Sequence, residues 1–203
     1  MREEITAYKR ERILEEAVKL FYERGFSGTT LDDIAGKLGV TKPFIYTHFR
    51  SKVELLEAIC SPTIELSLGA IAAAAAQPGS AAGRLFDGIV NFSKVVFQRQ
   101  ANIAVYFREE KNLSEAGLAG INALRKRFDR VLSDLLEEGA AAGEFSVADV
   151  RVAALAIGGM VSWAYTWYQP DGRLPIEAAG EKLAHLALHM VGVHPPPSEP
   201  ISP

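Results

Sequence analysis

The segment 30–52 holds side chains whose types and spacing suit contact with a nucleic acid. Its sequence, TLDDIAGKLGVTKPFIYTHFRSK, predicts two short helices separated by a glycine turn and then the start of another helix. Helical spacing points Val40, Ile45 and Phe49 back toward a three-helix core. The side chains left on the outward face are Thr41, Lys42, Pro43, Phe44, Tyr46, Thr47 and His48.

The outward face combines hydrogen-bond donors with apolar surface. Five of its side chains can donate to phosphates or base edges, and Pro43 and Phe44 can pack on thymine methyl groups. Thr29 and Thr30 stand at a helix N-terminus, where N–H groups and a hydroxyl suit a phosphate, and Lys52 offers a second phosphate contact. This is the layout of a helix-turn-helix that places its second helix in the DNA major groove. The alternative is a three-helix bundle with a solvated polar face.

Helical signals continue along the whole chain. Apolar residues at helical spacing mark a first helix around 13–21. The outward-facing helix is expected over Thr41–Phe49, and Ser51 and Glu54 form a capping box that opens a long fourth helix. A later helix is expected over 147–168. Because convincing strand alternation is absent, we predict an all-α fold of about nine helices, with a three-helix DNA-binding head followed by a larger helical body.

The charge distribution supports this division. Residues 1–52 carry 10 Lys/Arg and 8 Asp/Glu, a net +2, whereas the remainder carries 12 and 17, a net −5. A mildly basic head on an acidic body fits a DNA-reading module attached to another part. We therefore predict a helix-turn-helix domain at 1–52, a ligand-binding and dimerisation domain at 53–194 and a disordered tail at 195–203.

The sequence also indicates the cellular compartment. The charged N-terminal stretch lacks the apolar run of a signal peptide, and no run reaches the roughly 18 apolar residues of a membrane span. The one cysteine, Cys60, excludes an intrachain disulfide. We expect a cytoplasmic protein with no membrane segment and no cofactor.

The head resembles the TetR family of bacterial transcriptional regulators over about residues 8–56. The matching pattern comprises the amphipathic first helix with Gly25, then Thr29, Thr30, Ile34, Ala35, Leu38 to Val40, Tyr46 to Phe49, Ser51 and Lys52. The resemblance implies an all-helical homodimer with two DNA-binding heads and a ligand-binding body. It also implies repression at a palindromic operator that a small molecule relieves.

The resemblance further implies roles for individual side chains. Those expected to hold phosphates are Thr29, Thr30, Tyr46, His48 and Lys52. Lys42, Pro43 and Phe44 are expected to face bases, with Thr41 at the start of the helix. Phe44 departs from the smaller or polar residue that the family favours at its position.

Aromatic side chains in the body are candidates for an apolar pocket between helices. Trp163 and Trp167, one helical turn apart, are expected to share a face, and Arg108 could meet an anionic group at the pocket mouth. The candidate ligand-binding residues are Phe86, Val90, Phe97, Tyr106, Arg108, Met160, Trp163 and Trp167. The alternative is ordinary core for the aromatic residues and a solvated helix end for Arg108.

The segment VYFREEKNLSEAG, residues 105–117, resembles part of the acyl-CoA-responsive TetR-type regulators of lipid breakdown. This resemblance favours a large amphipathic acid or a coenzyme A thioester as the effector.

Small residues in the last two helices suit a four-helix interface between two copies of the chain, although they also permit packing within one copy. These residues are Ala153, Ala154, Ala156, Gly158, Gly159, Ala184, Ala187 and Leu188.

Two other functions compete with a ligand-released repressor. One is a DNA-binding regulator without an inducer, in which the aromatic residues are only core and dimer surface. The other is a helical enzyme or metal-binding protein using Glu181, His185 and His189, which recur every four residues. Because no catalytic or nucleotide-binding motif is present, we expect neither an enzyme nor a metal site.

Overall fold

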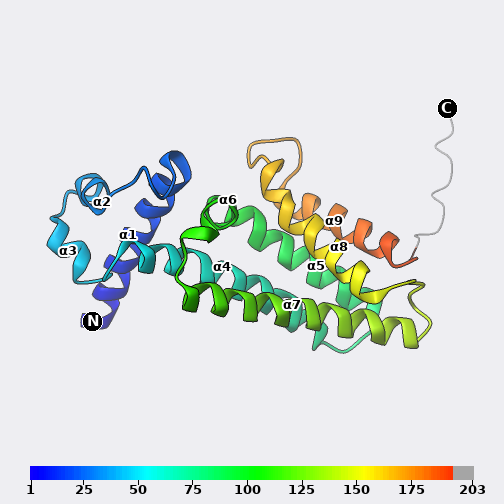
Figure 1. Cartoon of the computed structure of the whole chain (residues 1–203). Coiled ribbons are helices and arrows are strands. Elements are labelled where there is room, and N and C mark those ends of the chain that lie inside the picture. The colour runs from blue at the N-terminus through cyan, green and yellow to red at the C-terminus, as the bar shows by residue number, and fades with distance from the viewer. Residues whose placement is uncertain (194–203) are drawn as a thin grey trace. The chain divides into compact units, whose positions relative to one another are not determined.

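The computed structural model describes residues 1–193, and their regular elements are all helical (Figure 1). The elements are α1 (Arg2–Arg24), α2 (Leu31–Leu38), α3 (Lys42–Tyr46), α4 (Lys52–Ala75), α5 (Ala81–Gln98), α6 (Gln100–Glu109), η1 (Glu110–Asn112), α7 (Glu115–Ala141), α8 (Val150–Ser162), η2 (Trp163–Thr166) and α9 (Ile176–Met190). The all-α prediction with about nine helices is confirmed for this part of the chain. The predicted tail at 195–203 lies outside the described residues.

The first of two compact units consists of Met1–Glu65 together with Arg99–Leu124. Its apolar core is built mainly from α1, α2, α3 and the first half of α4, with Phe21, Ile45 and Leu56 fully buried. Val105 and Ile121, from α6 and α7, belong to the same core. The unit that contains segment 30–52 therefore extends beyond residue 52. The predicted domain boundary at residue 52 stays a prediction.

Side-chain caps define where several helices begin. The Thr30 hydroxyl accepts a hydrogen bond from Asp33 N at 3.1 Å, and the Asp33 carboxylate accepts one from Thr30 N at 2.8 Å. This reciprocal pair closes the first turn of α2 and lowers the pKa of Asp33. At α4, Ser51 Oγ accepts from Glu54 N as predicted, but the Glu54 carboxylate accepts from Arg50 N at 2.6 Å.

Two helices are shorter than the sequence predicted. The third helix, expected over Thr41–Phe49, ends at Tyr46, and a turn carries Thr47 and His48. The helix expected to reach residue 168 stops at Ser162 and continues as the 3-10 turn η2. Helical periodicity therefore does not fix the directions of Trp163 and Trp167.

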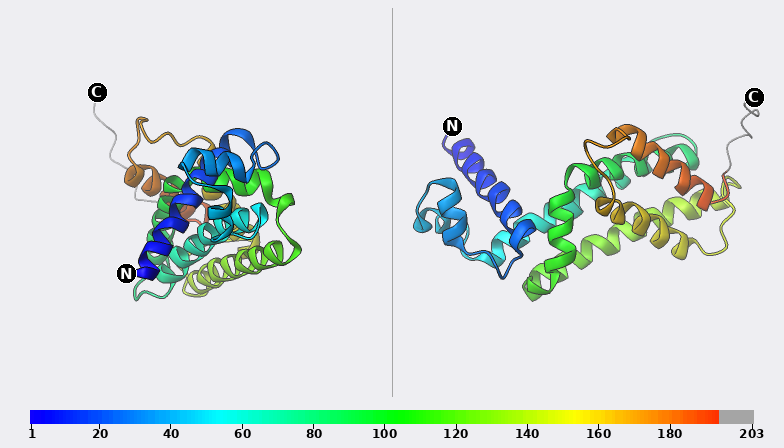
Figure 2. Two further views of the ribbon diagram at one scale, coloured as in Figure 1. Left: turned by 90° about the vertical axis from the view of Figure 1, so that its left-hand side faces the viewer. Right: turned by 90° about the horizontal axis from the view of Figure 1, so that it is seen from above.

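The second compact unit consists of Leu66–Gln98 and, within the described residues, 125–193. Its centre is the packing of α5 along α9, and α8 contacts both of these helices (Figure 2). The buried face of α5 presents Leu85, Ile89 and Phe92 at helical spacing. The Arg84 guanidinium forms an ion pair with Glu138 of α7 and donates a hydrogen bond to Ala75 O at 3.0 Å.

The outer faces of α8 and α9 expose large apolar side chains. Val152 is 60% exposed and Leu155 is 59% exposed on α8, and Leu186 is 49% exposed on α9. By contrast Ala154, Ala184 and Ala187, which the sequence suggested for a subunit interface, are buried within the unit. The suggestion is wrong for these three residues because they pack inside one copy.

One helix, α4, has the length and composition that a membrane crossing requires, with a mean hydropathy of 1.5 over its most apolar window. The prediction concerned an uninterrupted apolar run, and Glu54, Glu57 and Glu65 interrupt α4, so this helix does not overturn it. Helices in the cores of soluble proteins meet the same requirement, and Leu55, Leu56, Ile59 and Cys60 of α4 are buried in the first unit.

Glu144 connects the segment after α7 to the start of α5. Its carboxylate accepts hydrogen bonds from Ala82 N at 2.9 Å and Ala81 N at 3.0 Å, and these bonds lower the pKa of Glu144. A carboxyl group whose pKa is lowered by folding stabilises the fold above its unfolded pKa, and this contribution is lost as the pH falls through the folded value.

We therefore expect Glu144→Ala to lower the melting temperature near pH 7, and to lower it less near pH 3, because protonation of the wild-type carboxylate removes part of the same contribution. Thermal unfolding followed by circular dichroism at both pH values measures this. Glu137→Ala, at an exposed position on α7, is the control. An equal decrease for Glu144→Ala at both pH values would show that the carboxylate does not cap α5 through its charge.

Candidate nucleic-acid interface

The short helix α3 is fixed by residues on its inner side. Ile45 and Phe49 are 0% and 1% exposed, and Val40 is half-buried against the same core. The predicted inward direction of all three is confirmed. Arg10 of α1 reinforces this position, because its guanidinium donates to His48 O at 2.6 Å and lies 3.9 Å from the centre of the Phe49 ring.

The opposite side of α3 forms a polar and aromatic surface. Its exposed residues are Thr41, Lys42, Pro43, Tyr46 and Thr47. The Lys42 ammonium forms an ion pair with Asp32 of α2 at 2.6 Å, which raises the pKa of Lys42. Since both partners are exposed, the pair contributes little stability and Lys42 can exchange Asp32 for a DNA acceptor at small cost.

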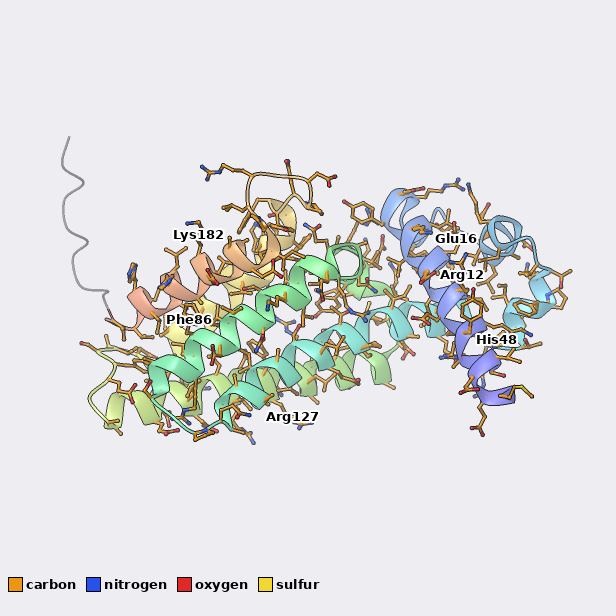
Figure 3. All side chains as sticks on the ribbon, turned by 180° about the vertical axis from the view of Figure 1, so that it is seen from behind. Arg12, Glu16, His48, Phe86, Arg127 and Lys182 are labelled. Atoms are coloured by element: carbon orange, nitrogen blue, oxygen red, sulfur yellow. The ribbon has the colours of Figure 1, made fainter. Side chains whose placement is uncertain are left out.

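Phe44 and His48 differ from these five residues because both are half-buried. Their rings meet edge to face, with centroids 5.1 Å apart. His48 lies beside the N-terminal part of α1 (Figure 3). Partial burial lowers the pKa of His48, and the cations Lys9 and Arg10 lower it further. A neutral imidazole still carries one N–H donor. The expectation that Phe44 points freely outward is corrected, because its ring also packs against the core.

Two predicted phosphate contacts have structural roles instead. Thr29 is fully buried, and its hydroxyl donates to Gly25 O at 2.9 Å and to Leu20 O at 3.2 Å. The prediction that this side chain holds a phosphate is therefore wrong. Thr30 remains exposed, but its hydroxyl and N–H both bond to the Asp33 carboxylate.

Lys52 is occupied inside the turn between α1 and α2. Its ammonium donates to Phe26 O at 2.7 Å and to Thr29 O at 2.8 Å, and it lies 4.2 Å from the centre of the Phe26 ring. An ammonium group has three donors, so one remains for a phosphate. The predicted phosphate contact by Lys52 is thus secondary to its bonds within the turn.

Glu109, at the end of α6, is a residue that sequence reasoning missed. Its carboxylate is buried and accepts from Phe26 N at 3.1 Å, Arg108 Nε at 3.1 Å and Asn112 Nδ2 at 2.9 Å. Gly25 takes a positive φ of 77° directly beside it, where a Cβ would come within 3.3 Å of Glu109 Oε1. Glu109 of α6 and Lys52 of α4 therefore both form hydrogen bonds with the turn between α1 and α2.

The candidate ligand-binding residues do not all fall in one unit. Tyr106 and Arg108 belong to the first unit, where Tyr106 is core and the Arg108 guanidinium donates to Phe21 O and Glu109. Arg108 was expected at a pocket mouth, and the structure instead bonds it to the end of α1. The other six, in the second unit, are Phe86, Val90, Phe97, Met160, Trp163 and Trp167.

Aromatic packing in the second unit is strongest around Phe97. This buried ring stacks on Tyr168 with centroids 4.0 Å apart, and Trp167 lies 6.2 Å away. Trp163 and Trp167 are both exposed, at 58% and 49%. A cavity of about 150 Å³ is lined by Trp167, Tyr168, Gln169, Gly172, Arg173 and Leu174. This volume is below the roughly 300–1,000 Å³ of typical small-molecule sites.

The proposed metal ligands on α9 are not gathered into a site. Within residues 1–193 no three His, Cys, Asp or Glu side chains lie close enough together to hold a metal ion. His185 instead packs its ring against Phe86, with centroids 5.1 Å apart.

Comparison with known proteins assigns both parts of the chain. The family model for "Bacterial regulatory proteins, tetR family" matches residues 13–59, and "Tetracyclin repressor-like, C-terminal domain" matches residues 78–191. The HTH-type transcriptional repressor KstR2 of Mycolicibacterium smegmatis is 27% identical over 189 residues, covering 92% of this chain and 91% of that protein.

Two solved structures are similar over nearly their full length. The TetR family transcriptional regulator PfmR from Thermus thermophilus is 30% identical with a TM-score of 0.82, covering 88% of this chain and 97% of that chain. AibR, in complex with isovaleryl coenzyme A and operator DNA, is 26% identical with a TM-score of 0.75, covering 87% of this chain and 96% of that chain.

The position of Lys52 predicts an effect on stability. Lys52→Ala leaves two carbonyl groups of the turn without their charged donor, and we expect it to lower the free energy of unfolding by about 1.5–3 kcal/mol. Urea denaturation measures the loss, with Lys37→Ala, on the exposed side of α2, as the control. Unchanged stability would show that the two hydrogen bonds of Lys52 do not stabilise the turn.

Proposed function

Since this chain belongs to the TetR family of bacterial regulatory proteins, we propose that it is a cytoplasmic repressor released from DNA by a small molecule. It binds a palindromic operator as a homodimer, and binding of an amphipathic effector lowers its affinity for that operator. The main support for DNA binding comes from α3. Ile45 and Phe49 anchor it in the core, and its polar and aromatic side chains face outward.

The outward residues divide by chemistry. Lys42 and Pro43, at the start of α3, are suited to base edges, since recognition helices read DNA with their N-terminal residues. Thr41, Tyr46 and Thr47 carry hydroxyls, and His48 a ring N–H, for phosphates or bases. Phe44 contributes the exposed part of its ring, and Lys52 adds a phosphate contact with its remaining donor. Thr30 has no donor left, because its hydroxyl and its N–H both bond to Asp33.

We infer that the effector is a coenzyme A thioester. Two observations support this inference: the resemblance of residues 105–117 to acyl-CoA-responsive regulators, and the similarity to AibR, whose structure contains isovaleryl coenzyme A and operator DNA. Phe86, Val90, Phe97 and Met160 supply buried or half-buried apolar surface in the second unit for the acyl group.

The effector can act on the head through α5 and α6. Phe86, Val90 and Phe97 lie on α5, and only Arg99 separates α5 from α6. The far end of α6 is bonded to the turn after α1 through Glu109 and Phe26. A displacement of α5 therefore reaches the DNA-reading unit along the chain. The effector shifts the equilibrium only by its difference in affinity for the two states.

Dimerisation is proposed to use the outer faces of α8 and α9. Val152, Leu155, Ala156 and Gly159 are exposed at the spacing of a single helical face, and Leu186 and Met190 are exposed one turn apart on α9. Contiguous exposed apolar surface of this kind marks an interaction site.

The repressor function is tested by gel-shift titration with the promoter DNA of the protein's own gene. We expect preferential binding over random duplex and release by isovaleryl-CoA or a longer acyl-CoA, with free coenzyme A as the control. At about 100 times the Kd, the thioester should also raise folding stability by about 2.7 kcal/mol. Equal binding to both duplexes contradicts the repressor assignment, and release by no thioester contradicts the effector class.

A charge within the α8 face should disrupt the dimer. We expect Leu155→Glu to sediment as a monomer at concentrations where wild type is a dimer, because a buried unpaired carboxylate opposes association. Leu66→Glu, at another exposed apolar position of the same unit, serves as the control. A dimeric Leu155→Glu protein would place the interface elsewhere.

A further inference from the structure

The helix α1 begins well before the core that it supports. Its first buried residue is Ile13, whereas Glu3 to Lys9 are all exposed. At 1.5 Å per residue, this exposed portion adds roughly 10 Å of helix outside the three-helix core. Such a segment buries little of its own apolar surface, so packing within the unit does not explain its length.

The exposed portion of α1 ends, at Lys9, beside the end of α3. Arg10 bonds to His48 O, and the Lys9 ammonium lies 5.6 Å from the centre of the Phe44 ring. Lys9 and Arg10 stand one turn before Ile13, so they continue the core-facing side of α1 past the point where the core ends. Both cations are therefore placed at the edge of the candidate DNA-reading surface.

The two cations are used differently. The Arg10 guanidinium is engaged by the His48 carbonyl and the Phe49 ring. Lys9 forms no ion pair with a carboxylate in the described part of the chain, and Phe44 is the ring over which its ammonium lies. A lysine held by an aromatic ring but lacking an anionic partner is poised to bind an anion.

We propose that Lys9 binds a backbone phosphate of the operator next to the bases read by α3, with the His48 ring as the second donor. The ligand is a DNA phosphodiester, and Lys9 itself lies on α1, outside the helix-turn-helix segment 30–52. Phe44, larger than the residue that the family favours, sets the position of Lys9 through the cation–π contact. This proposal rests on the proposed DNA-binding function.

The test measures how operator affinity depends on salt for wild type, Lys9→Gln and Lys9→Arg. Each phosphate neutralised contributes about 0.9 to the slope of log K against log salt concentration. We expect Lys9→Gln to reduce the slope by about 0.9 for each bound head and Lys9→Arg to preserve it. Lys9→Gln should weaken binding several-fold, and by the same factor on promoter DNA and random duplex, because phosphates carry no sequence.

Two other lysines provide matched comparisons. Lys19→Gln, at an exposed position of α1 beside Glu16, should leave both slope and affinity unchanged. Lys42→Ala should weaken promoter binding more than random binding, since it is proposed to face bases. Melting temperatures establish that every variant is folded.

The possible results distinguish failure of the Lys9 site from failure of the proposed DNA-binding function. A Lys9→Gln protein with the wild-type slope, while wild type still prefers its promoter, overturns the Lys9 site alone. A slope reduced equally by Lys19→Gln also overturns it, because the effect would then reflect overall charge. Wild-type protein that binds neither duplex overturns the proposed function together with this inference.

Discussion

The hydrogen bonds of the buried Glu109 carboxylate join α6 to the turn between α1 and α2, and the connection of α6 to the DNA-reading surface depends on them. A buried charge is costly unless it is fully hydrogen-bonded, and here Phe26 N, Arg108 and Asn112 supply the donors. Phe26 is in turn bonded through its carbonyl to Lys52 and packs its ring on Phe21, with centroids 5.4 Å apart. Phe26 thus joins α1, α4 and α6 just before the chain enters α2. The position of α2 and α3 follows from this junction.

The proposed effector can act on the DNA-reading surface through the same junction. A five-residue helix such as α3 is too short to be stable alone, and it takes its direction from Ile45, Phe49 and the contacts of Arg10. A displacement of α6 or α4 at Phe26 acts on the support of α3 without touching its outward side chains. Pro62, inside α4, removes one backbone hydrogen bond of that helix and offers a place for it to bend. Recognition and regulation can therefore be separated in this fold.

The sequence predicted those features that depend on local periodicity. The inward direction of Ile45 and Phe49, the cap at Ser51 and the all-helical architecture all follow from spacing and side-chain chemistry. Thr29 and Arg108 were interpreted as anion contacts because a hydroxyl or cation at a helix end suits an anion and a backbone carbonyl equally well. Only tertiary structure decides between the two. Glu109 gave no signal at all, since its partner Phe26 is 83 residues away in the chain.

We propose that Glu109 transmits the state of the effector to the operator-binding surface. Operator affinity is compared for wild type, Glu109→Ala and Glu110→Ala with and without the acyl-CoA that releases wild type. Wild type and Glu110→Ala are expected to lose operator affinity when the thioester is added. Glu109→Ala should bind both the operator and the thioester, and its operator affinity should fall far less. The same fold-decrease in operator affinity for all three proteins would show that Glu109 does not transmit the state of the effector.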